Sequence, residues 1–160
     1  MNKETWNAII NKTHYVEFDW FGFDKLGRIA VFSSFNEGFI PHKVTKSFDK
    51  FVEFEQLVKN LPKIGRAKLY TKNSGDFSDW ISYAEKGLVS FDYQEVHCIQ
   101  KTESYDLIAK SRVLLSILNI PNFKYFYEIL PEFNLDFDDI ENQISFLDLE
   151  NSEFEHRNLT

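Results

Sequence analysis

The order of apolar and polar residues changes period several times along the chain, and each change predicts an element. Apolar residues near the start recur at helical spacing, which predicts a helix over residues 3–12. Residues 15–21 alternate between apolar and polar side chains, as in a strand with one exposed face. The turn sequence at 24–27 and the apolar run at 28–32 extend this strand into a hairpin, with the second strand inside the sheet.

The middle of the chain alternates between helical and strand patterns. A broad apolar stripe predicts a helix over residues 47–60, and a second helix is expected between residues 76 and 87. Two strands rich in aromatic residues follow, at 88–93 and 105–109, and are expected to pair as neighbours. A last helical stripe covers residues 121–131. Hairpins grouped between helices favour an α+β fold, with a mostly antiparallel sheet and helices packed on it.

Length and composition fit one domain in the cytoplasm. With 160 residues, 43% of them hydrophobic, the chain can close a single core. We expect one α+β domain over residues 1–149 and a frayed acidic end over residues 150–160. The sequence has no run of about twenty apolar residues and no signal-like start, so no membrane association is expected. The single cysteine, Cys98, fits a reducing compartment.

Nearly all of the net negative charge lies at the C-terminal end. Residues 131–160 contain nine acidic residues and one basic residue, a net charge of −8, whereas residues 1–130 carry a net charge of +1. This acidity argues against nucleic acid as a partner. The segment is either a solvated end that maintains solubility or a face for a basic protein partner. Apolar residues interleaved with the acids favour a folded face, whose candidate residues are Asp136, Asp138, Asp139, Glu141, Asp148 and Glu150.

Motifs for metals and cofactors are missing from the sequence. The four histidines have no zinc-site spacing, and the six glycines form no nucleotide-binding motif. Asp136, Asp138 and Asp139 resemble part of a calcium loop, but its glycine and its closing glutamate are absent. We therefore expect neither a metal nor a cofactor.

A second candidate site lies near the first strand. Glu17 and Asp19 share one strand face, which is the arrangement of a catalytic carboxylate pair but also of many exposed strands. Together with Trp20 and Trp80 they define a possible aromatic pocket. A stacking platform for single-stranded nucleic acid is disfavoured, because acidic residues flank these rings.

Two segments carry a family resemblance. They are Asp19-Trp20-Phe21 with Asp24, Gly27, Ile29-Ala30, Phe32-Ser33-Ser34, Gly38 and Ile40-Pro41, and Trp80 with Ala84, Lys86-Gly87-Leu88 and Phe91-Asp92-Tyr93. These segments resemble small bacterial proteins of uncharacterised function, some of which are immunity proteins of polymorphic toxin systems. The resemblance implies a protein that neutralises a toxin domain.

Two functions follow from these observations. The first is a non-enzymatic cytoplasmic binding protein, an immunity protein that neutralises a basic toxin domain through its acidic surface. The alternative is an enzyme or small-ligand-binding module with its site in the aromatic pocket near Trp20 and Trp80. A convergent pocket with perturbed carboxylates would favour the alternative, and a flat acidic face would favour the binding protein.

Overall fold

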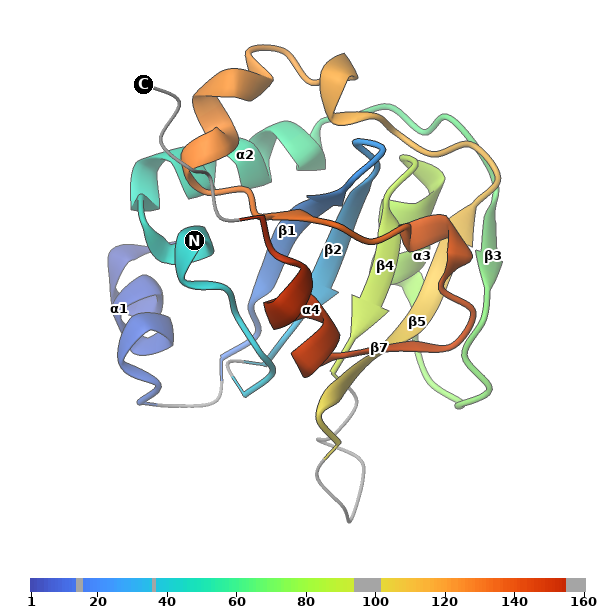
Figure 1. Cartoon of the computed structure of the whole chain (residues 1–160), viewed down its shortest axis with the longest axis horizontal. Coiled ribbons are helices and arrows are strands. Elements are labelled where there is room, and N and C mark those ends of the chain that lie inside the picture. The colour runs from blue at the N-terminus through green and yellow to red at the C-terminus, as the bar shows by residue number, and fades with distance from the viewer. Residues whose placement is uncertain (14–15, 36, 94–101, 155–160) are drawn as a thin grey trace.

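A computed structural model describes residues 1–13, 16–35, 37–93 and 102–154 of the protein, and Figure 1 shows a sheet flanked by helices. The α-helices are α1 (Lys3–Asn11), α2 (Phe48–Lys59), α3 (Ser78–Glu85) and α4 (Phe146–Ser152). The short 3-10 helices are η1 (His42–Thr45), η3 (Ile117–Asn119), η4 (Phe123–Glu128) and η5 (Phe137–Asp139). The strands are β1 (Asp19–Asp24), β2 (Ile29–Ser33), β3 (Ala67–Leu69), β4 (Val89–Asp92), β5 (Ser104–Ser111), β6 (Glu132–Phe133) and β7 (Gln143–Ser145).

The sheet is mixed, which corrects the expectation of a mostly antiparallel one. Its strand order is β3-β5-β4-β2-β1-β6, and β7 pairs with β5. The β1–β2 hairpin and the pairs that β5 makes are antiparallel, whereas β2–β4 and β1–β6 are parallel. The chain between β2 and β4 passes through α2, β3 and α3 and returns in its original direction, so these neighbours run parallel. The α+β class itself is as predicted.

The β1–β2 hairpin has the predicted turn. Gly27 adopts a φ of 79°, and its amide donates to the Asp24 carbonyl at 2.8 Å. All residues of β2 are buried, and this strand lies between β4 and β1, as expected for an inner strand. The first strand begins at Asp19 rather than near residue 15, and Phe18, just before it, packs against Phe51 of α2.

The helix boundaries follow local signals. The Ser47 hydroxyl caps α2 by accepting the Lys50 amide at 3.4 Å. Gly87 stops α3 with a φ of 91°, and its amide donates to the Ala84 carbonyl at 3.0 Å. The helix expected over residues 121–131 is the 3-10 helix η4.

The two faces of the sheet are covered by different parts of the chain, as Figure 1 shows. On one face, Phe21 of β1 packs against Phe54 of α2, with ring centroids 5.3 Å apart. On the other face, Phe32 of β2 packs against Phe137 of η5 at 5.9 Å. Helices α2 and α3 therefore cover one face, and the C-terminal segment with η5 and α4 covers the other.

The C-terminal segment contains regular structure up to Ser152. Helix α4 continues to Ser152, and the Phe154 amide donates to the Glu132 carbonyl at 2.8 Å. Residues 150–152 therefore lie in α4, and Glu153 and Phe154 lie beside β6, so the expected frayed end over residues 150–160 stays a prediction. Residues 155–160, the rest of that expected end, lie outside the described residues.

Candidate functional site

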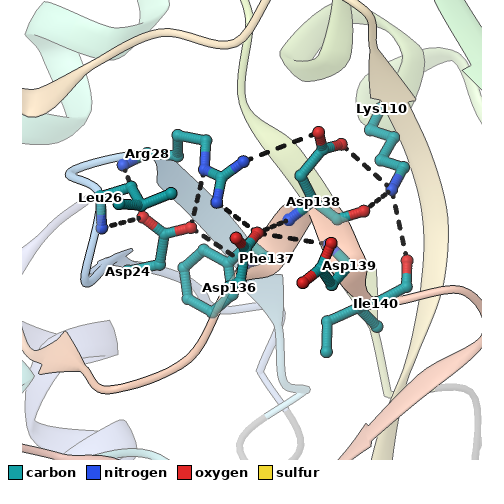
Figure 2. Close-up of polar contacts among 9 residues, drawn as sticks. All are labelled: Asp24, Leu26, Arg28, Lys110, Asp136, Phe137, Asp138, Asp139 and Ile140. Atoms are coloured by element: carbon teal, nitrogen blue, oxygen red, sulfur yellow. Dashed lines mark hydrogen bonds and ion pairs between the residues drawn. The ribbon is translucent and has the colours of Figure 1, made fainter.

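Asp24 is a buried carboxylate at the turn of the β1–β2 hairpin. Its side chain has no exposed surface, and it accepts four hydrogen bonds of 2.9 Å each. Two come from the backbone amides of Leu26 and Arg28, one from the Arg28 Nε and one from the Phe137 amide. Asp24 thus joins the hairpin to the C-terminal segment, as Figure 2 shows.

Arg28 and Lys110 extend this network into the acidic segment (Figure 2). The Arg28 guanidinium pairs with Asp136 and lies 3.6 Å from an Asp138 carboxylate oxygen. The Lys110 ammonium lies 3.3 Å from the other Asp138 oxygen and donates to the backbone carbonyls of Asp138 and Ile140. Two basic side chains from the sheet therefore anchor η5 and the loop after it.

The anchored acids differ from the exposed groups that the sequence suggested. The Asp136 side chain is only 19% exposed, and it caps η5 by accepting the amides of Asp138 and Asp139. The hydrogen bond from Arg28 lowers the pKa of Asp136. The Asp138 side chain is 51% exposed but forms ion pairs with Arg28 and Lys110. Asp136 therefore serves to hold the segment, and Asp138 is only partly available to a partner.

Four predicted acids remain on the surface. Asp139, Glu141, Asp148 and Glu150 are exposed and form no ion pair among the described residues. Leu147, next to Asp148 on α4, is 63% exposed. We call these four acids with Leu147 the acidic face. Asp139 and Glu141 lie in and just after η5, the part that Arg28 and Lys110 anchor. Leu147, Asp148 and Glu150 lie on α4, where Glu150 lines a hollow together with Lys43 and Lys46.

A small cavity of about 240 Å³ lies on the opposite face of the sheet. We call it the Asp19 pocket, and its lining includes Glu17, Asp19, Ser33, Asp79, Trp80 and Tyr83. Strands β1 and β2 supply Asp19 and Ser33, which are register partners in the hairpin. Helix α3 supplies Asp79, Trp80 and Tyr83. The structure thus brings three of the predicted pocket residues, Glu17, Asp19 and Trp80, to one cavity.

Trp20, the fourth predicted pocket residue, lies elsewhere. Its ring stacks on Phe32 at 4.1 Å, and its Nε1 donates to the Tyr105 hydroxyl at 3.1 Å. Because neighbouring residues of a strand point to opposite faces, Asp19 and Trp20 are on different sides of the sheet. Trp20 therefore belongs to the core beneath the C-terminal segment.

Asp19 is the most strongly constrained carboxylate of the pocket. It accepts hydrogen bonds from the Ser33 hydroxyl at 2.6 Å and from the Tyr83 hydroxyl at 2.9 Å. Burial raises the pKa of Asp19 above its ordinary value of 3.8; the two hydrogen bonds lower it, and the charges of Asp79 and Glu17 raise it further. The site therefore holds Asp19 in an environment that disfavours its charged form.

The sequence analysis missed two hydroxyl partners of Asp19, although signals for both exist. Ser33 follows from the hairpin register, because counting outward from the turn pairs it with Asp19. Tyr83 lies three residues after Trp80 on a predicted helix, which places the two side chains on one side of α3.

The described residues contain neither a metal-binding cluster nor a helix that could span a membrane. In the part of the chain that the structure describes, no three histidine, cysteine or carboxylate side chains are grouped to hold a metal ion. His14, His97, Cys98 and His156 lie outside the described residues. None of the described helices has the length and apolar character needed to cross a membrane.

Comparisons of the chain with models of protein families, with curated proteins and with solved structures find no match. The resemblance to immunity proteins therefore stays a prediction, and function has to be argued from the acidic face and the Asp19 pocket.

Replacing Asp19 by Asn should stabilise the protein near neutral pH. Because the pKa of Asp19 is raised on folding, its ionisation lowers stability as the pH rises from 3.8 through the folded-state value. The amide removes that cost, so we expect the Tm to rise near pH 7. The difference should disappear below pH 3.8, where both states carry the proton.

Thermal unfolding followed by circular dichroism over a pH series measures this difference. Glu53→Gln is the matched control, because Glu53 is exposed on α2 and lies outside the Asp19 pocket. A lower Tm for Asp19→Asn near pH 7 would show that ionised Asp19 stabilises the fold, and a difference that does not depend on pH would show that its ionisation does not affect stability.

Proposed function

We propose that this protein is a non-enzymatic cytoplasmic binding protein whose acidic face binds a basic protein partner. The observation that carries the proposal is the separation of roles within the C-terminal segment. Asp136 and Asp138 are held by Arg28 and Lys110, whereas the acids of the acidic face are exposed and unpaired among the described residues. An anchored segment loses little conformational entropy on binding, so its charges are preorganised for a partner.

The charge pattern supports fast, steered association. Unpaired surface acids attract a basic protein over distances of about a Debye length, roughly 10 Å at 0.1 M salt. The exposed Leu147 supplies an apolar contact of the kind that gives an interface its stability. The resemblance of residues 18–41 and 80–93 to immunity proteins makes a toxin domain the partner that we propose.

The test removes the charge of the acidic face and leaves its anchors in place. The variant carries Asp139→Asn, Glu141→Gln, Asp148→Asn and Glu150→Gln. It should fold as the wild type does, because these side chains are exposed and unpaired among the described residues. Asp136 and Asp138 are left unchanged, because Asp136 caps η5 and both contact Arg28.

Co-purification from the native host at low and at moderate salt, with retained proteins identified by mass spectrometry, measures the effect. We expect a basic protein to be retained by the wild type, to be released by salt and to be reduced about tenfold or more with the variant. A charge-matched control carries Glu4→Gln, Glu37→Gln, Asp49→Asn and Glu53→Gln and should retain that protein.

Two outcomes would contradict the proposal. The first is that the wild type and the acidic-face variant retain the same proteins at both salt concentrations, and the second is that neither retains a basic protein. Expression of the retained protein alone in a bacterial host tests the toxin assignment. Growth arrest that co-expression of this protein relieves supports it, and unaffected growth contradicts it.

A further inference from the structure

The Asp19 pocket contains more negative charge than its own basic groups neutralise. Lys59 and Met1 also line the cavity, but the Lys59 ammonium and the Met1 amino group each lie 3.5 Å from a carboxylate oxygen of Glu55, which lines the cavity too. Glu17, Asp19 and Asp79 form no ion pair among the described residues. Burial raises the pKa of Asp19, and the charges of Asp79 and Glu17 raise it further.

The walls of the pocket suit a flat or compact cation. Trp80 and Phe35 lie along the cavity together with the Tyr83 hydroxyl that donates to Asp19. Aromatic ring faces attract cations, most strongly those of tryptophan. The indole Nε1 of Trp80 is buried and has no hydrogen-bond partner among the described residues, so its N–H signal can report on binding at this wall.

The size of the cavity limits its occupant. A volume of about 240 Å³ is below the roughly 300–1,000 Å³ of sites for drug-sized ligands. It suits one charged headgroup rather than a whole nucleotide or sugar. The two hydroxyls that already hold Asp19, from Ser33 and Tyr83, fix the orientation of its carboxylate, so it is preorganised to accept a donor.

We propose that the Asp19 pocket binds a single organic cation, a guanidinium or primary ammonium group, with Asp19 as its deep counter-ion, Glu17 and Asp79 at the rim and Trp80 as an aromatic wall. The bound cation neutralises part of the repulsion among the three carboxylates. A desolvated cation in turn requires such paired charge. The site is separate from the acidic face, because α2 and α3 cover its side of the sheet and the C-terminal segment covers the other (Figure 1).

The cation can belong to a free small molecule or to an arginine or lysine side chain of a protein. The experiment therefore uses methylguanidinium, n-butylammonium and an arginine tripeptide with blocked ends as probes. The readout is the indole N–H signal of Trp80 in a two-dimensional ¹H–¹⁵N spectrum, assigned with Trp80→Phe. The chain has only three tryptophans, so this signal is easily separated.

Methylguanidinium or n-butylammonium should shift the Trp80 signal in a saturable way, whereas neutral N-methylurea at equal ionic strength should not. Asp19→Asn should weaken binding about tenfold or more, and Asp79→Asn about two- to threefold, because Asp79 is exposed. Glu53→Gln, which removes one carboxylate outside the pocket, should bind as the wild type does.

The probes also separate the two sources of the cation. Binding of the tripeptide as tight as that of methylguanidinium supports a protein side chain as the natural occupant, and exclusion of the tripeptide supports a free small cation. The proposal is overturned if neither cation shifts the signal, if N-methylurea shifts it equally, or if both Asp19→Asn and Asp79→Asn bind the cations as the wild type does.

Discussion

Replacing Asp24 by Ala should lower the free energy of unfolding by about 3–5 kcal/mol, the range measured when one partner of a buried ion pair is removed. The carboxylate is fully buried and satisfies the Nε of Arg28 and the amides of Leu26, Arg28 and Phe137. Its loss leaves those amide donors without their acceptor, and the hydrogen bond from the Phe137 amide is buried away from water. The effect should be large because the hairpin turn and the C-terminal segment lose one shared contact.

Urea unfolding monitored by fluorescence measures the loss. Lys25→Ala is the neighbouring control: the Lys25 side chain is exposed, so the change should stay within about 0.5 kcal/mol. A double-mutant cycle with Arg28→Ala isolates the Asp24–Arg28 interaction. If Asp24→Ala costs less than about 1 kcal/mol, the buried network does not hold the hairpin to η5 as described.

Local signals made a large part of the fold predictable from the sequence. The turn at 24–27, the helix over residues 47–60 and the helix between residues 76 and 87 each depend on residues close in sequence, and each is found close to where the pattern placed it. The stripe of apolar residues in α2 likewise faces the core through Phe51 and Phe54. Such elements need only the local chain to specify them.

Pairings between distant segments were not predictable in the same way. Strands β3, β6 and β7 have three residues or fewer, which is too short for a period of two to stand out. They form because they pair with strands far away in sequence: β6 pairs with β1, and β7 pairs with β5. The parallel β2–β4 pair also depends on a crossover whose path no local pattern contains.

In the candidate sites, too, contacts set by local structure were predictable and contacts between distant segments were not. Asp19 and Ser33 are partners by hairpin register. Because side chains alternate between the two faces of a strand, Asp19 and Trp20 point to opposite faces, so the expected pocket containing Asp19 and Trp20 was inconsistent with the predicted strand. The contact between Arg28 and Asp136, by contrast, joins residues 108 positions apart. Counting charges in the C-terminal segment could not reveal that one of them was already neutralised.

Val31→Asp should prevent stable folding, with an expected loss of more than about 4 kcal/mol, because it buries an unpaired charge. Val31 is fully buried in β2, with Phe21 of β1 and Ser90 of β4 as its register partners on the two sides. Val113→Asp is the matched control, since Val113 is 50% exposed and its change should cost less than about 1 kcal/mol. Thermal unfolding of both variants decides the matter. A cooperative transition for Val31→Asp near the wild-type Tm would contradict the placement of β2 at the centre of the sheet.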